Sequence, residues 1–415
     1  MSRVVIVGAG FGGLGCAWTF ANQVSKDAVA KVTVVDSKDW FTIGGTWAYA
    51  WCDRVPVMDT KWNLHDAKPQ LPGVEMKLNT TVMSIDTEKK TVTLSDAPND
   101  PTPYDYLVLS PGVVGDPSGI SGLDQCVDMY SHQHVERQKT DLARIVTNAK
   151  ADNATRQTLA VVIAATPYKC PVAPFEAAFV ADDFLRRNGV RDTVDIVVTA
   201  PVPWPLPDPA KEIFTTYLTE KNVTFSPSVK IKNVTREKDD TVVTFEDDSC
   251  INAAAVWAVY PQTAPTFIKD AKLTNPMGFV PANIGTNKIT NDVAGREFIF
   301  CIGDCAGLSA NGKPHPKAGE FAWQMGEMVA HDIGKSADYT HSRLGACIAE
   351  CGGGAGVLVA PDFTACVLDP ENGNPKVQVA DKREGGEAYK VAWVAKYITK
   401  VFGDIGRVFE PSAVA

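Results

Sequence analysis

Cys170 is the residue of this 415-residue sequence that most directly suggests a reaction. It lies in the segment Thr166-Pro-Tyr-Lys-Cys-Pro-Val-Ala-Pro-Phe-Glu176, between an apolar strand and the helical stretch Phe175–Arg187. The thiolate is the reactive form of cysteine, and a helix N-terminus and a neighbouring cation such as Lys169 both favour it. We therefore predict a lowered pKa and a redox or nucleophilic role for Cys170. The alternative is a buried residue that only caps the helix.

The N-terminal segment has the pattern of a phosphate-binding turn. The β-branched run Val4–Val7 is followed by glycines and then by the helical stretch Leu14–Asn22. The glycines that fit the spacing G-x-G-x-x-G are Gly8, Gly10 and Gly13. Glycines at this spacing allow a tight turn, close approach of a pyrophosphate and packing of helix on strand, while the helix N-terminus attracts negative charge. A second strand ends at Asp36, where a carboxylate would accept hydrogen bonds from an adenosine ribose. Together these features predict a dinucleotide site; the alternative is a glycine-rich turn without a nucleotide.

Later segments favour FAD over NAD as that dinucleotide. Glu297–Ala306 predicts a strand ending in Gly303-Asp304 and resembles the second FAD fingerprint of flavoproteins with two dinucleotide folds. Tyr104–Gly112 is similar to the strand and crossover of those flavoproteins. In that family the helix after Lys317 faces the flavin, where its dipole and this lysine would stabilise the anionic reduced form; the alternative for Lys317 is a solvated lysine in the first helical turn. The residues expected to bind FAD are Gly8, Gly10, Phe11, Gly12, Gly13, Asp36, Ser37, Pro111, Gly112, Gly303, Asp304 and Lys317.

The order of the segments predicts an α/β fold with an internal duplication. Val74–Ser95 and Val223–Asp248 each contain alternating strands around a charged turn, and each is followed by a buried strand. We predict two Rossmann-like domains and a C-terminal module. The ranges are 1–112 plus 291–335 for the FAD-binding domain, 113–290 for the second domain with Cys170, and 336–415 for the module. The second domain has prolines where a nicotinamide nucleotide would need backbone N–H groups, so no NADH site is expected there.

Taken in order and spacing, these motifs resemble the sulfide:quinone oxidoreductases and the flavoprotein subunit of flavocytochrome c sulfide dehydrogenase. Both belong to the FAD-dependent pyridine nucleotide-disulfide oxidoreductase superfamily. The most specific match is Cys170-Pro-Val-Ala-Pro-Phe-Glu176. The resemblance implies a second redox cysteine over the flavin at Cys347, with Cys351 as the alternative. Tyr130 and Ser131 stand where some members have a third cysteine, which implies the two-cysteine form.

The resemblance also implies a reaction. Hydrosulfide would attack a disulfide or sulfur bridge between Cys170 and Cys347, leaving a persulfide on one sulfur and a thiolate on the other. The electrons would then pass to FAD and on to a quinone. Glu176 would move protons, or would only stabilise the start of its helix. His134 resembles a histidine that some members use for proton traffic, but we expect a surface or hydrogen-bonded histidine there. Flavocytochrome-type subunits attach FAD through a cysteine where this sequence has Ile43, so FAD is expected to be non-covalent.

Three other functions fit the same motifs. The first is a sulfide dehydrogenase like flavocytochrome c, with a cytochrome as electron acceptor. The second is a type II NADH:quinone oxidoreductase, which the missing second glycine fingerprint argues against. The third is a redox sensor that binds FAD without turnover.

Composition and charge narrow the partners and the location. A net charge of −9, with 45% apolar and 21% charged residues, is typical of a globular chain and argues against a nucleic-acid partner. No apolar run approaches the eighteen or more residues that a membrane-spanning helix needs, and no export signal is apparent, so we expect a cytoplasmic protein. The segment Tyr389–Phe402 predicts an amphipathic helix with Lys390, Lys396 and Lys400 on its polar side, within the range 389–409 considered for membrane contact. Such a helix suits peripheral contact with a membrane, or packing on the protein's own core or on a second copy in a homodimer. No metal site is expected, because Cys301-x-x-x-Cys305 lacks further ligands.

Overall fold

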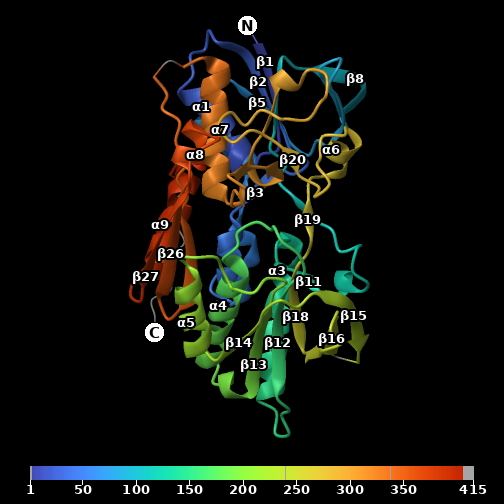
Figure 1. Ribbon diagram of the computed structural model, residues 1–415, viewed down its shortest axis with the longest axis vertical. Helices are drawn as coiled ribbons and strands as arrows, with labels where there is room; N and C mark the ends of the chain where they lie inside the picture. The colour runs from blue at the N-terminus through green and yellow to red at the C-terminus, as the bar shows by residue number, and fades with distance from the viewer. Residues whose placement is uncertain (1, 239, 337, 405–415) are drawn as a thin grey trace.

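Two parallel sheets stacked along the long axis of the molecule form its framework in the computed structural model (Figure 1). The structure describes residues 2–238, 240–336 and 338–404. The sheet of the upper half has the strand order β21-β9-β1-β2-β5, and all its neighbours are parallel. These strands span Ile299–Cys301, Tyr106–Leu109, Ser2–Val7, Val29–Val35 and Val74–Lys77. The β-branched run Val4–Val7 lies in β1, the central strand of this sheet. A parallel sheet that is covered on both faces needs apolar side chains on both faces of its strands.

The sheet of the lower half has the strand order β11-β18-β12-β13-β14 and is also parallel. Its strands span Val127–Asp128, Ala255–Val259, Gln157–Ile163, Val194–Thr199 and Val223–Ser226. Each half also carries a three-stranded antiparallel sheet. These are β6 (Val82–Asp86), β7 (Thr91–Leu94) and β8 (Ala97–Pro103) above, and β15 (Ile231–Glu237), β16 (Asp240–Phe245) and β17 (Cys250–Ala253) below. The predicted α/β fold with two Rossmann-like halves is confirmed.

Helices cover both sheets. In the upper half, α1 (Phe11–Asn22) packs closely on α7 (Gly319–Gly334), since a Cβ atom on Gly326 would lie 2.3 Å from the Gly12 carbonyl oxygen. The helices of the lower half are α3 (Val135–Ala149), α4 (Ala173–Arg187) and α5 (Lys211–Glu220). The close contact of α1 with α7 fixes the N-termini of both helices, which lie at the same end of the upper sheet (Figure 1).

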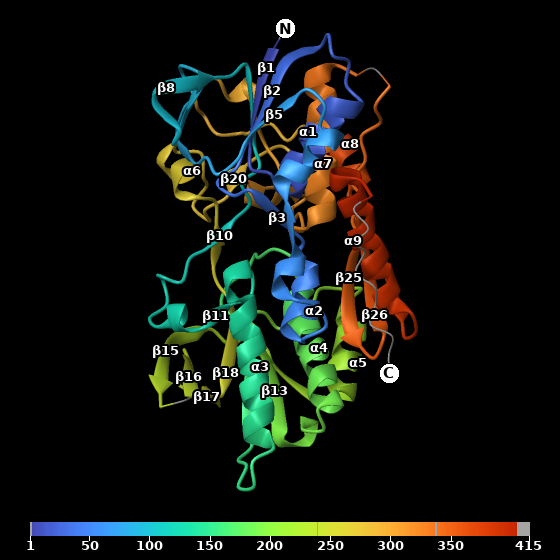
Figure 2. The same cartoon turned by 180° about the vertical axis from the view of Figure 1, so that it is seen from behind.

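Two segments pack outside the domain ranges expected from the sequence. Residues of α2 (Trp47–Trp51) lie in the core of the lower half, beside α3 and α4 (Figure 2). In the other direction, α6 (Thr266–Asp270) and the apolar residues Leu273, Val280, Ile284 and Ile289 pack in the core of the upper half. The chain crosses between the halves at an antiparallel pair, β10 (Val114–Gly115) with β19 (Gln262–Thr263), so residues after this pair already belong to the upper half. The two halves therefore exchange segments on both sides of the crossing.

The C-terminal module bridges the two halves along one side of the molecule (Figure 2). It contains the antiparallel sheet β25 (Cys347–Gly352), β26 (Ala355–Asp362) and β27 (Lys376–Lys382), together with α8 (Thr364–Leu368) and α9 (Gly386–Phe402). The apolar face of α9 is buried in the core of the upper half. Its buried residues there are Val394, Tyr397, Ile398, Val401 and Phe402.

This packing of the apolar face of residues 389–402 agrees with the second of the two expectations stated for the segment. That face is covered by the protein's own core, which was the stated alternative. Residues 405–409 of the predicted segment lie outside the described residues. Among the residues that the structure describes, we find no helix with both the length and the apolar character that a bilayer crossing requires.

Candidate functional site

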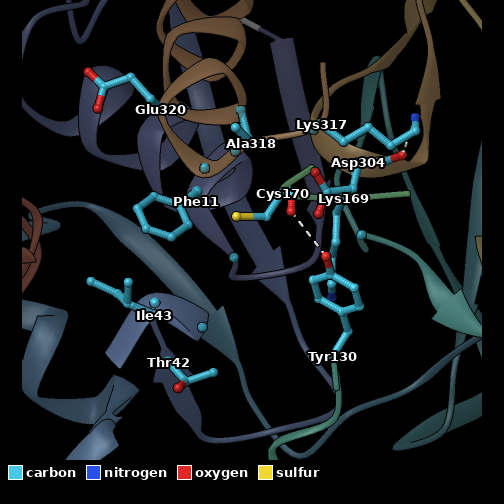
Figure 3. A pocket seen from close by; sticks show the side chains of 18 of the residues that line it. Phe11, Thr42, Ile43, Tyr130, Lys169, Cys170, Asp304, Lys317, Ala318 and Glu320 are labelled. Atoms are coloured by element: carbon cyan, nitrogen blue, oxygen red, sulfur yellow. Dashed lines mark hydrogen bonds between the residues drawn. The ribbon is translucent and has the colours of Figure 1, made fainter. Parts of the chain in front are cut away.

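A cavity of about 420 Å³ lies where the two halves and the C-terminal module meet. Its wall is built from the turn after β1, the loop after β9, the loop before α4, the start of α7 and the start of β25. Figure 3 shows that the Cys170 sulfur, the Phe11 ring and the Tyr130 ring face this space. A cavity of this size and mixed character is typical of a cofactor or substrate site.

The turn after β1 has the shape that a pyrophosphate needs. Gly8 has a φ of +101°, and a Cβ atom on Gly13 would lie 1.8 Å from the Gly8 carbonyl oxygen, so both positions exclude a side chain. A Cβ atom on Gly10, by contrast, would meet no protein atom within 4 Å, and Gly10 lines the cavity at the N-terminus of α1. The open space beside Gly10 and the helix N-terminus together fit the pyrophosphate of FAD.

The second predicted contact, Asp36, also lies on the cavity wall. Its carboxylate accepts hydrogen bonds from the backbone N–H groups of Ala9 at 2.7 Å and Lys38 at 2.9 Å. These bonds aim the carboxylate beside the glycine turn and leave each oxygen a further lone pair for a ribose hydroxyl. Ser37 was predicted as a neighbouring contact, but its side chain is exposed and the residue does not line the cavity.

Other predicted cofactor contacts lie on the same wall. They are Phe11, Gly12, Pro111, Gly112, Gly303, Asp304 and Lys317. The Lys317 ammonium donates to the carbonyl oxygens of Asp304 at 2.7 Å and Ala306 at 2.8 Å, and lies 4.0 Å from the centre of the Phe279 ring. Its burial lowers its pKa. Lys317 is therefore not a solvated lysine: it holds the Gly303-Asp304 turn in place at the edge of the cavity.

The backbone of Cys170 is fixed from three sides. Its N–H donates to the Lys317 carbonyl oxygen at 2.7 Å, and its own carbonyl oxygen accepts from the Tyr130 hydroxyl at 3.0 Å and from the Ala173 N–H at 2.9 Å (Figure 3). The residue has a φ of +49°, in the left-handed region that residues other than glycine seldom occupy. These hydrogen bonds hold Cys170 in its strained backbone conformation. In that conformation the thiol points into the cavity.

The thiol of Cys170 does not have the lowered pKa that the sequence predicted. Burial raises its pKa, and the neighbouring Cys347 and Glu176 raise it further. The cation that opposes this effect is Lys390 of α9, not Lys169. The Lys169 ammonium instead lies 5.5 Å from the centre of the Tyr130 ring. Helix α4 begins only at Ala173, so Cys170 precedes its first turn.

The two candidates for the second cysteine lie in different surroundings. Cys347, the first residue of β25, lines the cavity, and burial raises the pKa of its thiol to about 12. Cys351 is buried in the core of the lower half and its Sγ atom lies 3.5 Å from the Ala349 carbonyl oxygen. Cys170 and Cys347 are the only cysteines on the cavity wall among the residues that the structure describes, and both are free thiols.

The remaining cysteines lie away from the cavity. Cys52, the cysteine nearest in sequence to Ile43, is buried in the core of the lower half, whereas Ile43 itself lines the cavity. The Sγ atoms of Cys301 and Cys305 lie 3.4 Å apart in the upper core. No group of three or more metal-ligating side chains occurs in the described part of the chain.

Glu176 lies one turn into α4 and lines the cavity beside both cysteines. Burial raises its pKa, against the effect of Lys390, whose ammonium lies 2.7 Å from its Oε1 atom. The sequence placed Lys390 on the polar side of α9, but only 4% of it is exposed. Its helix is covered on two sides, by the upper half and by β25, so a charged residue can face inward when a carboxylate meets it there.

No role was assigned from the sequence to several polar residues of the cavity wall, among them Tyr130, His132 and Glu320. Tyr130 stands, with Ser131, where the resemblance placed the third cysteine of some family members, and that position was itself the signal. His132 is buried, hydrogen-bonds Thr60 Oγ1 at 2.8 Å and has a pKa lowered to about 4, chiefly by burial. His134, two residues later, lies outside the cavity wall, and its Nδ1 atom accepts a hydrogen bond from the Asp128 N–H.

Comparison with known proteins places the chain in a family. The model of the pyridine nucleotide-disulphide oxidoreductase family matches residues 2–326. The mitochondrial sulfide:quinone oxidoreductase of Schizosaccharomyces pombe is 24% identical over 337 residues, covering 74% of this chain and 69% of the relative. That of Dictyostelium discoideum is 20% identical over 361 residues, covering 84% of this chain and 75% of the relative. The solved structure of the sulfide:quinone oxidoreductase of Aquifex aeolicus is similar over 99% of this chain and 94% of its own, with a TM-score of 0.76 at 20% identity.

Proposed function

We propose a substrate and an electron acceptor for this chain, which belongs to the pyridine nucleotide-disulphide oxidoreductase family and is an FAD-dependent oxidoreductase. The proposed substrate is sulfide, and the proposed acceptor is a quinone. The observation that carries the proposal is the meeting of Cys170 and Cys347 on the wall of a cavity whose other wall is the glycine turn. The names of the similar proteins from yeast and slime mould point the same way.

The cysteine pair accounts for the sulfur chemistry. When the pair is joined as a disulfide, hydrosulfide attacks one sulfur, a new S–S bond forms to that cysteine, and the bond between the cysteines breaks to leave a thiolate on the other. Joining the persulfide to that thiolate as a trisulfide releases one proton and two electrons. FAD bound beside the pair supplies the acceptor for those electrons and the link to the quinone. We infer that the FAD is held non-covalently, since Ile43 stands on the cavity wall and Cys52 does not.

Glu176 is the group placed to take the proton. It lines the cavity beside both thiols, and its raised pKa makes it a better proton acceptor near neutral pH than an exposed carboxylate. Tyr130 holds the Cys170 carbonyl and thereby the direction of the thiol.

The test is an anaerobic titration of the purified yellow protein with sulfide and, separately, with NADH, followed by flavin absorbance. We expect sulfide to bleach the flavin or to produce a long-wavelength charge-transfer band, and NADH to leave it oxidised. Cys170→Ser and Cys347→Ser should each abolish the response to sulfide, whereas the matched control Cys351→Ser should keep it. Bleaching by NADH with no response to sulfide would exclude the proposed substrate. Reoxidation of the reduced protein by a soluble quinone analogue, compared with cytochrome c, then tests the acceptor.

A further inference from the structure

A run of alternating charges extends from the cavity wall to the protein surface. The Lys390 Nζ atom lies 2.7 Å from Glu176 Oε1 and 3.7 Å from Glu350 Oε2. The Arg54 Nη1 atom lies 2.8 Å from Glu350 Oε1 and 2.7 Å from Glu387 Oε1. Glu176 and Lys390 line the cavity, while toward the outer end of the run 11% of the Arg54 side chain and 7% of the Glu387 side chain are exposed. The order of charge from the cavity outward is negative, positive, negative, positive, negative.

Four segments that are distant in sequence supply this run. Glu176 belongs to α4, Glu350 to β25, and both Lys390 and Glu387 to α9, while Arg54 follows α2. Figure 2 shows α2, α4 and β25 side by side. The Glu350 backbone N–H also donates to Glu176 Oε1 at 2.8 Å, so β25 and α4 are joined directly as well as through the lysine.

Because the charged side chains of this run are largely buried, each of them depends on its neighbours for compensation. A buried charge is costly unless an opposite charge and hydrogen bonds compensate it. The run holds three carboxylates and two cations, and Asp183 adds a carboxylate 3.8 Å from Arg54 Nη2. Burial raises the pKa of Glu176 and of Glu387. Burial lowers the pKa of Lys390, but Glu176 and its other neighbours more than reverse this, so the lysine stays charged.

The charged groups that face Glu176 are Lys390 of α9 and Glu350 of β25. The other titratable groups around it are neutral at physiological pH. They are the thiols of Cys170, Cys347 and Cys351 and the phenol of Tyr49, and burial raises the pKa of each. The ionisation of Glu176 therefore depends on how Lys390 divides its attraction between two carboxylates.

We propose that Glu350 and Arg54 are positioning residues: they fix the Lys390 ammonium between two carboxylates and so set whether Glu176 carries a proton at the cavity wall. Arg54 compensates Glu350, which leaves the lysine available to Glu176. Only the use of that proton in sulfide oxidation rests on the proposed function. Because the charges alternate, removing successive members of the run should move the protonation of Glu176 in opposite directions.

The experiment reads Glu176 itself, without substrate. In the FAD-loaded protein, the infrared C=O band of the protonated Glu176 carboxyl is identified by its loss in Glu176→Gln, and its midpoint is followed against pH. In Glu350→Gln, Glu176 is the one carboxylate of this pair that still attracts the Lys390 ammonium. The midpoint of Glu176 should therefore fall by about one pH unit or more. Arg54→Gln leaves Glu350 uncompensated, draws the lysine away and should raise the midpoint by a similar amount. Arg54→Lys keeps the charge and should restore it toward the wild-type value.

Two further variants keep the test decisive if Arg54→Gln does not fold. Glu387→Gln, at the outer end of the run, should lower the midpoint by less than Glu350→Gln does. Glu384→Gln is the matched control, since it removes an exposed carboxylate in the loop before α9 and should change nothing. Equal midpoints in folded Glu350→Gln and wild-type protein, or shifts of the same sign for Glu350→Gln and Arg54→Gln, would overturn the proposal. A wild-type protein that ignores sulfide would instead refute the proposed function and leave these midpoints as they are.

Discussion

Two glycines of the turn after β1 should respond differently to the same substitution. In Gly13→Ala the new Cβ atom would lie 1.8 Å from the Gly8 carbonyl oxygen and 2.9 Å from its carbon, far inside van der Waals contact. The turn and α1 must separate, and overpacking of this kind costs about 1–3 kcal/mol. Because a backbone carbonyl cannot rotate away as a side chain can, we expect the upper end of that range.

Gly10→Ala should leave the free energy of unfolding almost unchanged. Its φ of −82° and ψ of −167° suit any residue, and the Cβ atom meets no protein atom within 4 Å. Alanine at a helix N-cap is less favourable than glycine by about 0.5–1 kcal/mol, and the lower entropy of the unfolded chain returns about 0.4–1 kcal/mol. The Cβ atom instead enters the space assigned to the pyrophosphate. We expect at least about a tenfold loss of FAD affinity, which corresponds to about 1.4 kcal/mol.

Both effects are measurable on one preparation. Urea unfolding of the cofactor-free protein, followed by circular dichroism, gives the stability of each variant, and quenching of flavin fluorescence gives the affinity for FAD. Equal destabilisation by the two substitutions would show that the turn is a structural unit with no open side. Wild-type FAD affinity in Gly10→Ala would show that the pyrophosphate lies elsewhere.

Three further outcomes follow from single contacts. His132 has a pKa of about 4 in the fold against about 6.5 unfolded, so the unfolded chain binds a proton first as pH falls. Stability should therefore be full above pH 6.5 and fall by up to about 3 kcal/mol between pH 6.5 and 4, and His132→Gln should remove this dependence in urea titrations. Tyr130→Phe removes the bond to the Cys170 carbonyl and should cost about 1 kcal/mol in urea unfolding, with slower flavin reduction by sulfide; an unchanged rate would show that Cys170 holds its direction unaided. Lys317→Met leaves two carbonyl oxygens without their donor and should lower thermal stability by about 1–3 kcal/mol, an effect that a solvated lysine would not have.

The parts of the site that the sequence predicted best are those whose physics lies within consecutive residues. A tight turn, an open helix N-terminus and a following carboxylate are all specified between Gly8 and Asp36, and in the structure these three features lie together on the cavity wall. The loop with Cys170 could also be recognised from consecutive residues. The direction of the pKa shift of its thiol was predicted wrongly, because the prediction used the cation next in sequence, Lys169, whereas the cation that acts on the thiol is Lys390.

Lys390 shows why that information is absent from a local pattern. Helix α9 has charged and apolar residues at helical spacing, and such a pattern assumes one face in the core and one in water. In this fold the helix is buried on both sides: Val394 and Tyr397 pack in the upper core, and Lys390 faces α4 and β25. A lysine can be buried there only because Glu176 meets it, and neither segment alone specifies the pair. The chemistry of this cavity is therefore encoded in matched charges of distant segments, which is also why Glu350 and Arg54, far from any motif, can govern the proton at its wall.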